Sequence, residues 1–173
     1  MANDPDISLY SEEIAACLHR SLARTTRLLG VFLSNMMPAF SNATEACVVN
    51  TAPSKHPGLH WVAYFRDKGK QIEFFDSVGF APEDYGLPPA RRVSHDTIQA
   101  LDSHVCGQYC VFYLCARSHG LSPTQVLGML KAVPVLKREL FLVDFCKSLL
   151  TKCKCTNKIQ RCTCPNLFCT HCQ

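Results

Sequence analysis

Two runs rich in aromatic and β-branched residues, separated by a short polar loop, most strongly limit the fold of this chain. They cover residues 59–66 and 70–77, with Asp67-Lys68-Gly69 between them. Glycine at the third loop position suits the left-handed backbone that a three-residue hairpin loop needs. We therefore predict an antiparallel hairpin built from these two runs.

The length of this loop predicts a register for the hairpin. If Arg66 faces Lys70, counting back in pairs places His60 directly across from Asp76. Residues that face each other in an antiparallel pair share one face, with Cβ atoms about 5 Å apart. The hairpin is thus expected to bring an imidazole and a carboxylate together, while Glu73 points to the opposite face.

Hydrophobic patterns outline further elements on both sides of the hairpin. The apolar residues between positions 11 and 32 recur at mostly helical intervals and predict an amphipathic helix there. The short apolar run 46–51 predicts a buried strand. Residues 79–102 are rich in proline and glycine and predict irregular chain with a short strand around 91–93. Three helices are expected at 106–117, at 123–131 after the Ser122 cap, and after Pro134.

Composition bounds the kind of protein. The 173 residues, 47% of them hydrophobic and 18% charged, fit one globular domain over residues 1–150 and a cysteine-rich tail over 151–173. The first residues lack the pattern of a signal peptide, and no apolar run is long enough to cross a bilayer. We expect a soluble intracellular monomer with reduced thiols and without membrane contact. A net charge of +4 favours polyanions without identifying one.

Cys106 opens the most apolar of the predicted helices. A thiol attacks carbonyl groups as the thiolate, and unpaired amides at a helix start favour a negative charge there. A single cysteine is more often a small buried hydrophobe. The helix start, together with the predicted His60–Asp76 pair, favours a nucleophile at Cys106 and a base at His60, with Asp76 orienting the ring.

Two more residues near Cys106 suit the same chemistry. Gln99 precedes it in a loop, where the side-chain amide could supply one oxyanion donor and the Cys106 backbone N–H the other. Gly107 is expected to leave room for a substrate backbone. Other histidines compete with His60 for the role of base, and they are His56, His95, His104 and His119.

These motifs, taken together, resemble a known family. The segments 46–51 and 75–80, the His60-Trp61 pair, Gln99 and Cys106-Gly107-x-x-Cys110 look like the adenovirus endopeptidases, or adenains. That family belongs to the clan of cysteine proteases that includes the SUMO-deconjugating enzymes. The resemblance implies an α+β fold with a central mixed sheet packed between helices and the nucleophile at the start of a buried helix.

By the same resemblance, His60 is the base, Asp76 the orienting acid, Gln99 the oxyanion residue and Cys106 the nucleophile. No cofactor is required for this chemistry, although the family implies a peptide or DNA activator. Adenains hold their activator peptide by a disulfide from a cysteine between the acid and the nucleophile, whereas residues 80–105 contain no cysteine here. Adenains also carry Glu at the acid position, while other members of the clan use Asp.

The tail has no counterpart in the resemblance. It contains six cysteines and one histidine, at Cys153, Cys155, Cys162, Cys164, Cys169, His171 and Cys172. These soft ligands could form a tetrahedral zinc site, although Cys-x-Cys is tighter than the usual Cys-x-x-Cys spacing. A reduced tail without metal and disulfides formed on oxidation are the alternatives. Nearby lysines and arginine would also suit a nucleic-acid contact.

The function that follows is a cysteine endopeptidase that processes viral or virus-like precursor proteins at small, glycine-containing sites. The source implied is an adenovirus-related virus or a virus-like transposon. For a viral protein, the virion and the host nucleus are the expected locations. Two alternatives stay open: a protease that removes SUMO-type ubiquitin-like proteins, and a non-enzymatic, zinc-stabilised protein that binds nucleic acid or assists assembly.

Overall fold

A five-stranded mixed sheet organises the part of the chain that the computed structural model describes, residues 8–53 and 60–151. The strands lie in the order β1-β2-β3-β4-β5; the two outer pairs are parallel and the two inner pairs antiparallel. Along the chain the elements are α1 (Ser11–Ser21), β1 (Arg27–Leu33), η2 (Ser34–Met36), β2 (Glu45–Asn50), β3 (Trp61–Arg66), β4 (Glu73–Phe75), η3 (Pro82–Tyr85), β5 (Arg91–Arg92), α2 (Cys106–Ser118), α3 (Pro123–Lys131) and α4 (Val135–Leu150). The predicted α+β class with a central mixed sheet is confirmed.

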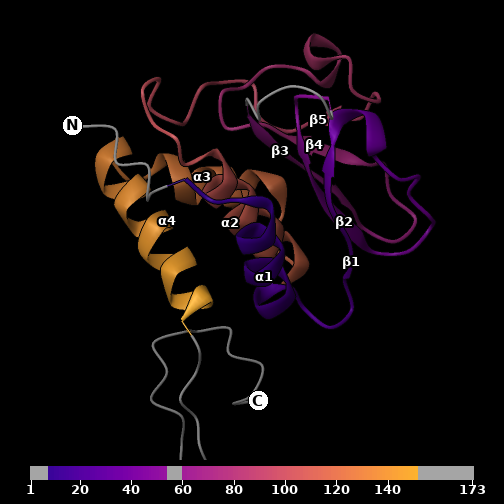
Figure 1. Cartoon of the computed structure of the whole chain (residues 1–173), viewed down its shortest axis with the longest axis horizontal. Coiled ribbons are helices and arrows are strands. Elements are labelled where there is room, and N and C mark those ends of the chain that lie inside the picture. The colour runs from indigo at the N-terminus through magenta and orange to yellow at the C-terminus, as the bar shows by residue number, and fades with distance from the viewer. Residues whose placement is uncertain (1–7, 54–59, 152–173) are drawn as a thin grey trace, which may run out of the picture.

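The two faces of the sheet have different covers. Because side chains alternate along a strand, Ala46 and Val48 of β2 pack into a core shared with α1, α2, α3 and α4, while Cys47 and Val49 face the other way. On that second face they join Tyr64 and Phe74 beneath loop residues. Figure 1 shows the α-helices gathered on one side of the sheet. The helical cover of the described residues is therefore one-sided, and the expected packing of the sheet between helices is wrong.

Helix α2 is buried over most of its surface, as its consecutive apolar residues predict. Its side chains contact both the sheet and the surrounding helices, and Tyr113 stacks on Phe75 of β4 with ring centroids 4.3 Å apart. The helix begins at Cys106 and is followed at Gly120 by a residue in the left-handed region. The sheet and helix packing therefore set the position of Cys106.

The prediction of one helix over residues 11–32 is wrong. Helix α1 ends at Ser21, and the chain then turns, with Thr26 N donating to Ala23 O, into strand β1. β1 pairs in parallel with β2 across its whole length, with an irregularity between Leu28 and Gly30. The pattern of apolar residues, at positions 28, 29, 31, 32 and 33, is compatible both with a helix and with a strand that is packed on both faces. Pairing with β2 decides between the two.

The hairpin forms, but its predicted register is wrong by two residues. Phe65 pairs with Glu73 and Ala63 with Phe75, so the partner of Arg66 is not Lys70. The turn closes early, by the bond from Lys70 N to Asp67 O, and β4 starts only at Glu73. Gly69 adopts the expected left-handed conformation, with φ of 73°. A shift by two keeps every side chain on its predicted face.

The remaining elements follow the predictions closely. Strand β2, the short β5, and helices α3 and α4 lie where the sequence indicates them. The Ser122 side chain caps α3 by accepting a hydrogen bond from Gln125 N. Within residues 8–53 and 60–151, no helix combines the length and apolar character that crossing a bilayer requires.

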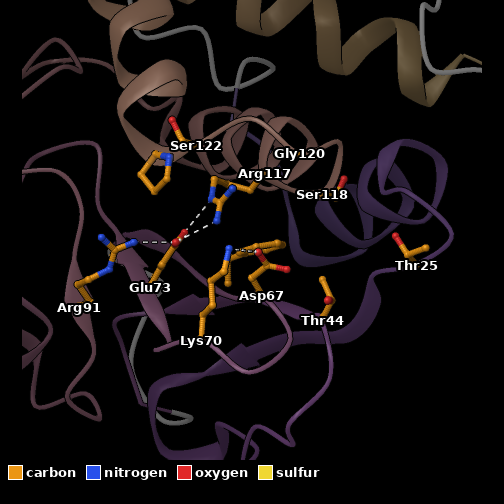
Figure 2. A pocket seen from close by; sticks show the side chains of 12 residues that line it. Thr25, Thr44, Asp67, Lys70, Glu73, Arg91, Arg117, Ser118, Gly120 and Ser122 are labelled. Atoms are coloured by element: carbon orange, nitrogen blue, oxygen red, sulfur yellow. Dashed lines mark hydrogen bonds and ion pairs between the residues drawn. The ribbon is translucent and has the colours of Figure 1, made fainter.

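A buried charge network fastens the far end of α2 to the sheet. Arg117 donates two hydrogen bonds to Glu73, at 2.8 and 2.9 Å, and Glu73 also accepts from Tyr113 and Arg91. Figure 2 shows Glu73 between the two guanidinium groups. Glu73, Arg91 and Arg117 line a cavity of about 310 Å³. Glu73 faces away from Asp76, as predicted. Since the charges pair with one another, the network joins β4, β5 and α2.

Candidate active site

His60 and Asp76 lie at the same end of two neighbouring strands. His60 comes directly before β3 and Asp76 directly after β4, and these strands are antiparallel. The Nε2 atom of His60 lies 2.6 Å from Oδ1 of Asp76. The predicted contact therefore forms in spite of the shifted register, because neighbours on a diagonal of a sheet remain within reach of long side chains.

Asp76 is completely buried, and its carboxylate is held by several donors. Val78 N donates to Oδ1, while Phe80 N and the Tyr85 hydroxyl donate to Oδ2 at 2.9 and 3.0 Å. Ser94 Oγ bonds the backbone of Asp76 on both sides, donating to O and accepting from N. These donors satisfy the hydrogen-bonding capacity of the buried carboxylate and fix its orientation.

Gly79 allows the loop after Asp76 to close around the carboxylate. Its φ is 82°, and a Cβ atom there would lie 2.8 Å from the backbone carbon of Asp96. The neighbouring Val78 and Phe80 supply two of the amides that bond Asp76. The glycine in this segment is thus required by both backbone conformation and close packing.

Cys106 is the first residue of α2 and is buried, and its interaction with the His60 imidazole contributes to the raised pKa of His60. Since Nε2 of His60 faces Asp76, the nitrogen left for the thiol is Nδ1. The first-turn amides of a helix have no partners inside the helix and favour a negative charge. His60 thus interacts with both Asp76 and Cys106.

The electrostatic surroundings favour protonated His60. Burial lowers the pKa of His60, but the hydrogen bonds to Asp76 and Cys106 and the negative charges of both groups outweigh it and raise the pKa from 6.5 to about 9. The ring is therefore an imidazolium at neutral pH. Such a cation beside a thiol promotes thiolate formation.

Gln99 is buried in the loop before α2, and both ends of its amide are engaged. Ser77 Oγ donates to Oε1 at 2.7 Å, and Nε2 donates to Ser103 O at 2.8 Å. Because a carbonyl can only accept, the amide nitrogen must be the atom that faces Ser103. One N–H of Nε2 remains for another acceptor.

The competing histidines within the described residues lie elsewhere. His95 and His104 are exposed, and His119 follows α2 at the end opposite Cys106, where its ring contacts Ser21 O. His56 lies outside the described residues. The position of His60 beside a buried carboxylate therefore distinguishes it from His95, His104 and His119.

Other buried thiols have surroundings that disfavour a thiolate. Burial raises the pKa of Cys110 well above its ordinary value, and it raises that of Cys115 to about 12. Their thiols face backbone carbonyls, those of Trp61 and Ser21. All six cysteines of the described residues are free thiols. Cys110 and Cys115 thus behave as small packing residues.

The expected role of Gly107 is wrong. A Cβ atom at this position would meet the side chains of Ile14, Leu9 and Trp61 at 3.2 to 3.4 Å, so its α-carbon faces the core. Glycine is needed here so that α1 and the segment before it can pack closely on α2. The missing side chain of Gly107 thus makes space for other side chains inside the protein.

The sequence patterns missed several residues that hold the site. Tyr85 and Ser94 bond Asp76, and Glu139 of α4 bonds the loop that carries Gln99. No periodicity or short motif marks them, because they come from turns and a helix far away in the sequence. The tail with the proposed zinc ligands lies outside the described residues. Within those described, no cluster of three or more His, Cys, Asp or Glu could hold a metal ion.

No family model matches this chain. A cysteine protease of African swine fever virus is 34% identical over 103 residues, which cover 49% of this chain and 38% of that protein. The protease of snake adenovirus serotype 1 is 26% identical over 142 residues, covering 68% of this chain and 69% of the relative. The chain thus spans about two fifths of the African swine fever virus protease.

Among solved structures, the central domain of an uncharacterised Legionella pneumophila protein superposes with a TM-score of 0.51 at 14% identity. The match covers 84% of this chain and 99% of that domain. At this identity the likeness concerns the fold alone. The sequence relatives come from two groups of viruses, and in both they are named proteases. The resemblance of this chain to the adenain-like cysteine proteases is therefore confirmed.

Proposed function

We propose that this chain is a cysteine endopeptidase of viral or virus-like precursor proteins, with Cys106 as nucleophile, His60 as base and acid, and Asp76 as orienting group. The observation that carries the proposal is the 2.6 Å contact between His60 and the buried Asp76, beside a thiol at a helix start. The protease relatives support the same reaction class.

In the first half of the proposed reaction, the Cys106 thiolate attacks the scissile carbonyl carbon and forms a C–S bond. The carbonyl π electrons move to oxygen, and this oxyanion accepts hydrogen bonds from the free N–H of Gln99 and from the Cys106 backbone N–H. Collapse of the tetrahedral intermediate breaks the C–N bond while imidazolium His60 protonates the leaving amine. A thioester at Cys106 and a neutral His60 result.

In the second half, neutral His60 takes a proton from water, which attacks the thioester carbon. The C–S bond breaks, the new carboxylic acid leaves, and the thiolate and imidazolium are restored. Asp76 holds the ring in place and stabilises its positive charge throughout, without taking the proton itself.

The test is to label the protein with a peptide vinyl sulfone ending in Gly-Gly and to map the modified peptide. We expect the label on Cys106. The Cys106→Ala variant should lose peptide cleavage, whereas Cys110→Ala and Cys115→Ala should retain much of it because burial raises the pKa of both of these thiols. Turnover retained by Cys106→Ala would overturn the proposal.

A second enzymatic function uses the same site. Another African swine fever virus relative carries the name SUMO-1 cysteine protease, and its match is 33% identical over 103 residues. Cleavage of SUMO or ubiquitin conjugates in preference to linear capsid-type peptides would favour deconjugation. The non-enzymatic alternative, a zinc-stabilised nucleic-acid-binding or assembly protein, requires instead that thiol-reactive inhibitors leave function untouched.

The partners and location belong to this proposal as well. Its substrates are viral precursor proteins, and a peptide or DNA is the activator class that the family resemblance suggests. A protein of the virion and the host nucleus would encounter both these substrates and these activators. Addition of DNA or of peptides from viral precursors to a cleavage assay tests the activator directly.

A further inference from the structure

The loop between Gln99 and Cys106 is bonded to helix α4 by the carboxylate of Glu139. Glu139 of α4 accepts hydrogen bonds at one oxygen, Oε1, from the backbone N–H of Ala100 at 2.8 Å and from the Ser103 hydroxyl at 3.1 Å. Leu101, between these two points, is 91% exposed. Without such contacts a surface loop of this kind has few interactions to give it one conformation.

Ser103 connects this carboxylate to the candidate oxyanion residue. The same residue that donates to Glu139 through its hydroxyl accepts from Gln99 Nε2 through its carbonyl. Ser77 holds the opposite end of the Gln99 amide. The direction of the remaining Gln99 N–H therefore depends on where the Ser103 carbonyl lies, and Glu139 holds Ser103.

Arg138, the residue before Glu139, secures the start of the same loop. Its guanidinium donates to Ile98 O, which also accepts from the Tyr109 hydroxyl of α2, and to Val133 O. Two adjacent side chains of α4 thus bond the backbone on either side of Gln99. These contacts tie the loop to a rigid helix over residues 98–103.

We propose that Glu139 is a positioning residue for the oxyanion donor Gln99, acting through Ser103 and the Ala100 amide. This inference rests on the proposed protease function. The carboxylate touches neither the substrate nor the thiol. It keeps the Gln99 amide aimed at the site where the oxyanion forms, and a loosened donor stabilises developing charge less well.

The test compares Glu139→Ala, Glu139→Gln and Asp144→Ala in peptide cleavage by the full chain. Glu139→Ala should lower kcat about tenfold with little change in KM, because the oxyanion donor acts on the transition state. Glu139→Gln keeps an acceptor oxygen at the same place and should restore most of the rate. Asp144→Ala removes an exposed carboxylate from the same helix and should leave kcat unchanged.

A double variant separates positioning from general damage. In a Gln99→Ala background, Glu139→Ala should have no further effect on kcat, since the group through which it acts is already gone. Alkylation of Cys106 by iodoacetamide forms no oxyanion, so its rate should be equal in wild type and Glu139→Ala. A slower alkylation, or additive losses in the double variant, would overturn the inference.

The proposed function and this inference fail in different ways. If the wild-type protein cleaves no peptide, or if Cys106→Ala still does, the protease proposal fails. If cleavage depends on Cys106 while Glu139→Ala keeps its full kcat, only the role of Glu139 is wrong.

Discussion

The Nε2 atom of His60 lies 2.6 Å from Oδ1 of Asp76, although the β3–β4 ladder does not pair these residues directly. Each lies just beyond the end of its strand, where the side chain is free to lean along the sheet. The contact joins a carboxylate fixed by several donors to a ring that also reaches Cys106. Both Asp76 and Cys106 thus stabilise the positive charge on His60.

The first prediction concerns pH. The pKa of His60 is raised from 6.5 to about 9, so the stability that protonated His60 contributes is fully present below pH 6.5 and is lost as pH rises through about 9. The free energy of unfolding should fall over this interval in wild type, as measured by urea denaturation. In His60→Ala this part of the fall should be absent, and an unchanged profile would contradict the assignment.

The same shift predicts the alkaline limb of activity. We expect kcat/KM to decline with an apparent pKa near 9, as the imidazolium that protonates the leaving amine disappears. His60→Ala should lose nearly all cleavage. Asp76→Asn should be milder and should move the alkaline limb to lower pH, since an amide orients the ring but stabilises its charge less. Equal severity of His104→Ala and His60→Ala would point to a different base.

Removal of the candidate oxyanion donor should act on the chemical step. Gln99→Ala is expected to lower kcat by about 10²-fold, with little change in KM, because the donor bonds the developing charge and not the ground-state carbonyl. Steady-state kinetics with a peptide substrate measure both constants. Gln71→Ala, which truncates an exposed glutamine in the hairpin connection, is the matched control. A normal kcat in Gln99→Ala would make Gln99 a purely structural loop residue.

The charge network at the far end of α2 should matter for stability and not for chemistry. Arg117→Met leaves Glu73 buried beside a single, half-exposed arginine, and breaking a buried pair in this way costs about 3–5 kcal/mol of unfolding free energy. Arg91→Met removes the more exposed partner and should cost clearly less. Equilibrium denaturation of both variants checks the order, and equal losses would contradict it.

The last prediction concerns the cysteine-rich tail, which lies beyond the described residues. If its cysteines bind zinc, protein purified without chelator should carry stoichiometric metal, and truncation after Leu150 should remove it. His60, Asp76, Gln99 and Cys106 all precede the tail, so the truncated protein should still cleave a short peptide. Elemental analysis and peptide kinetics measure the two outcomes. Absence of zinc would exclude a metal site, and loss of cleavage would show that the tail supports the active site.

Local patterns were sufficient for most elements and for the candidate residues themselves. The consecutive apolar residues of α2, the Ser122 cap and the glycine of the hairpin turn act over a few residues, so their effects can be predicted from sequence. The order of His60, Asp76, Gln99 and Cys106 likewise needs no structure to be noticed. A resemblance based on that order also indicated the protease class that the relatives support.

Only the tertiary structure decided which of two compatible local structures residues 27–33 adopt, because pairing with β2 outweighs a pattern that also suits a helix. It also decided the hairpin register, through a turn that closes before β4 begins. The inward-facing α-carbon of Gly107 and the reach of Glu139 to the Gln99 loop depend on contacts between distant segments. Such contacts leave no local pattern, since they result from how the helices pack on the sheet.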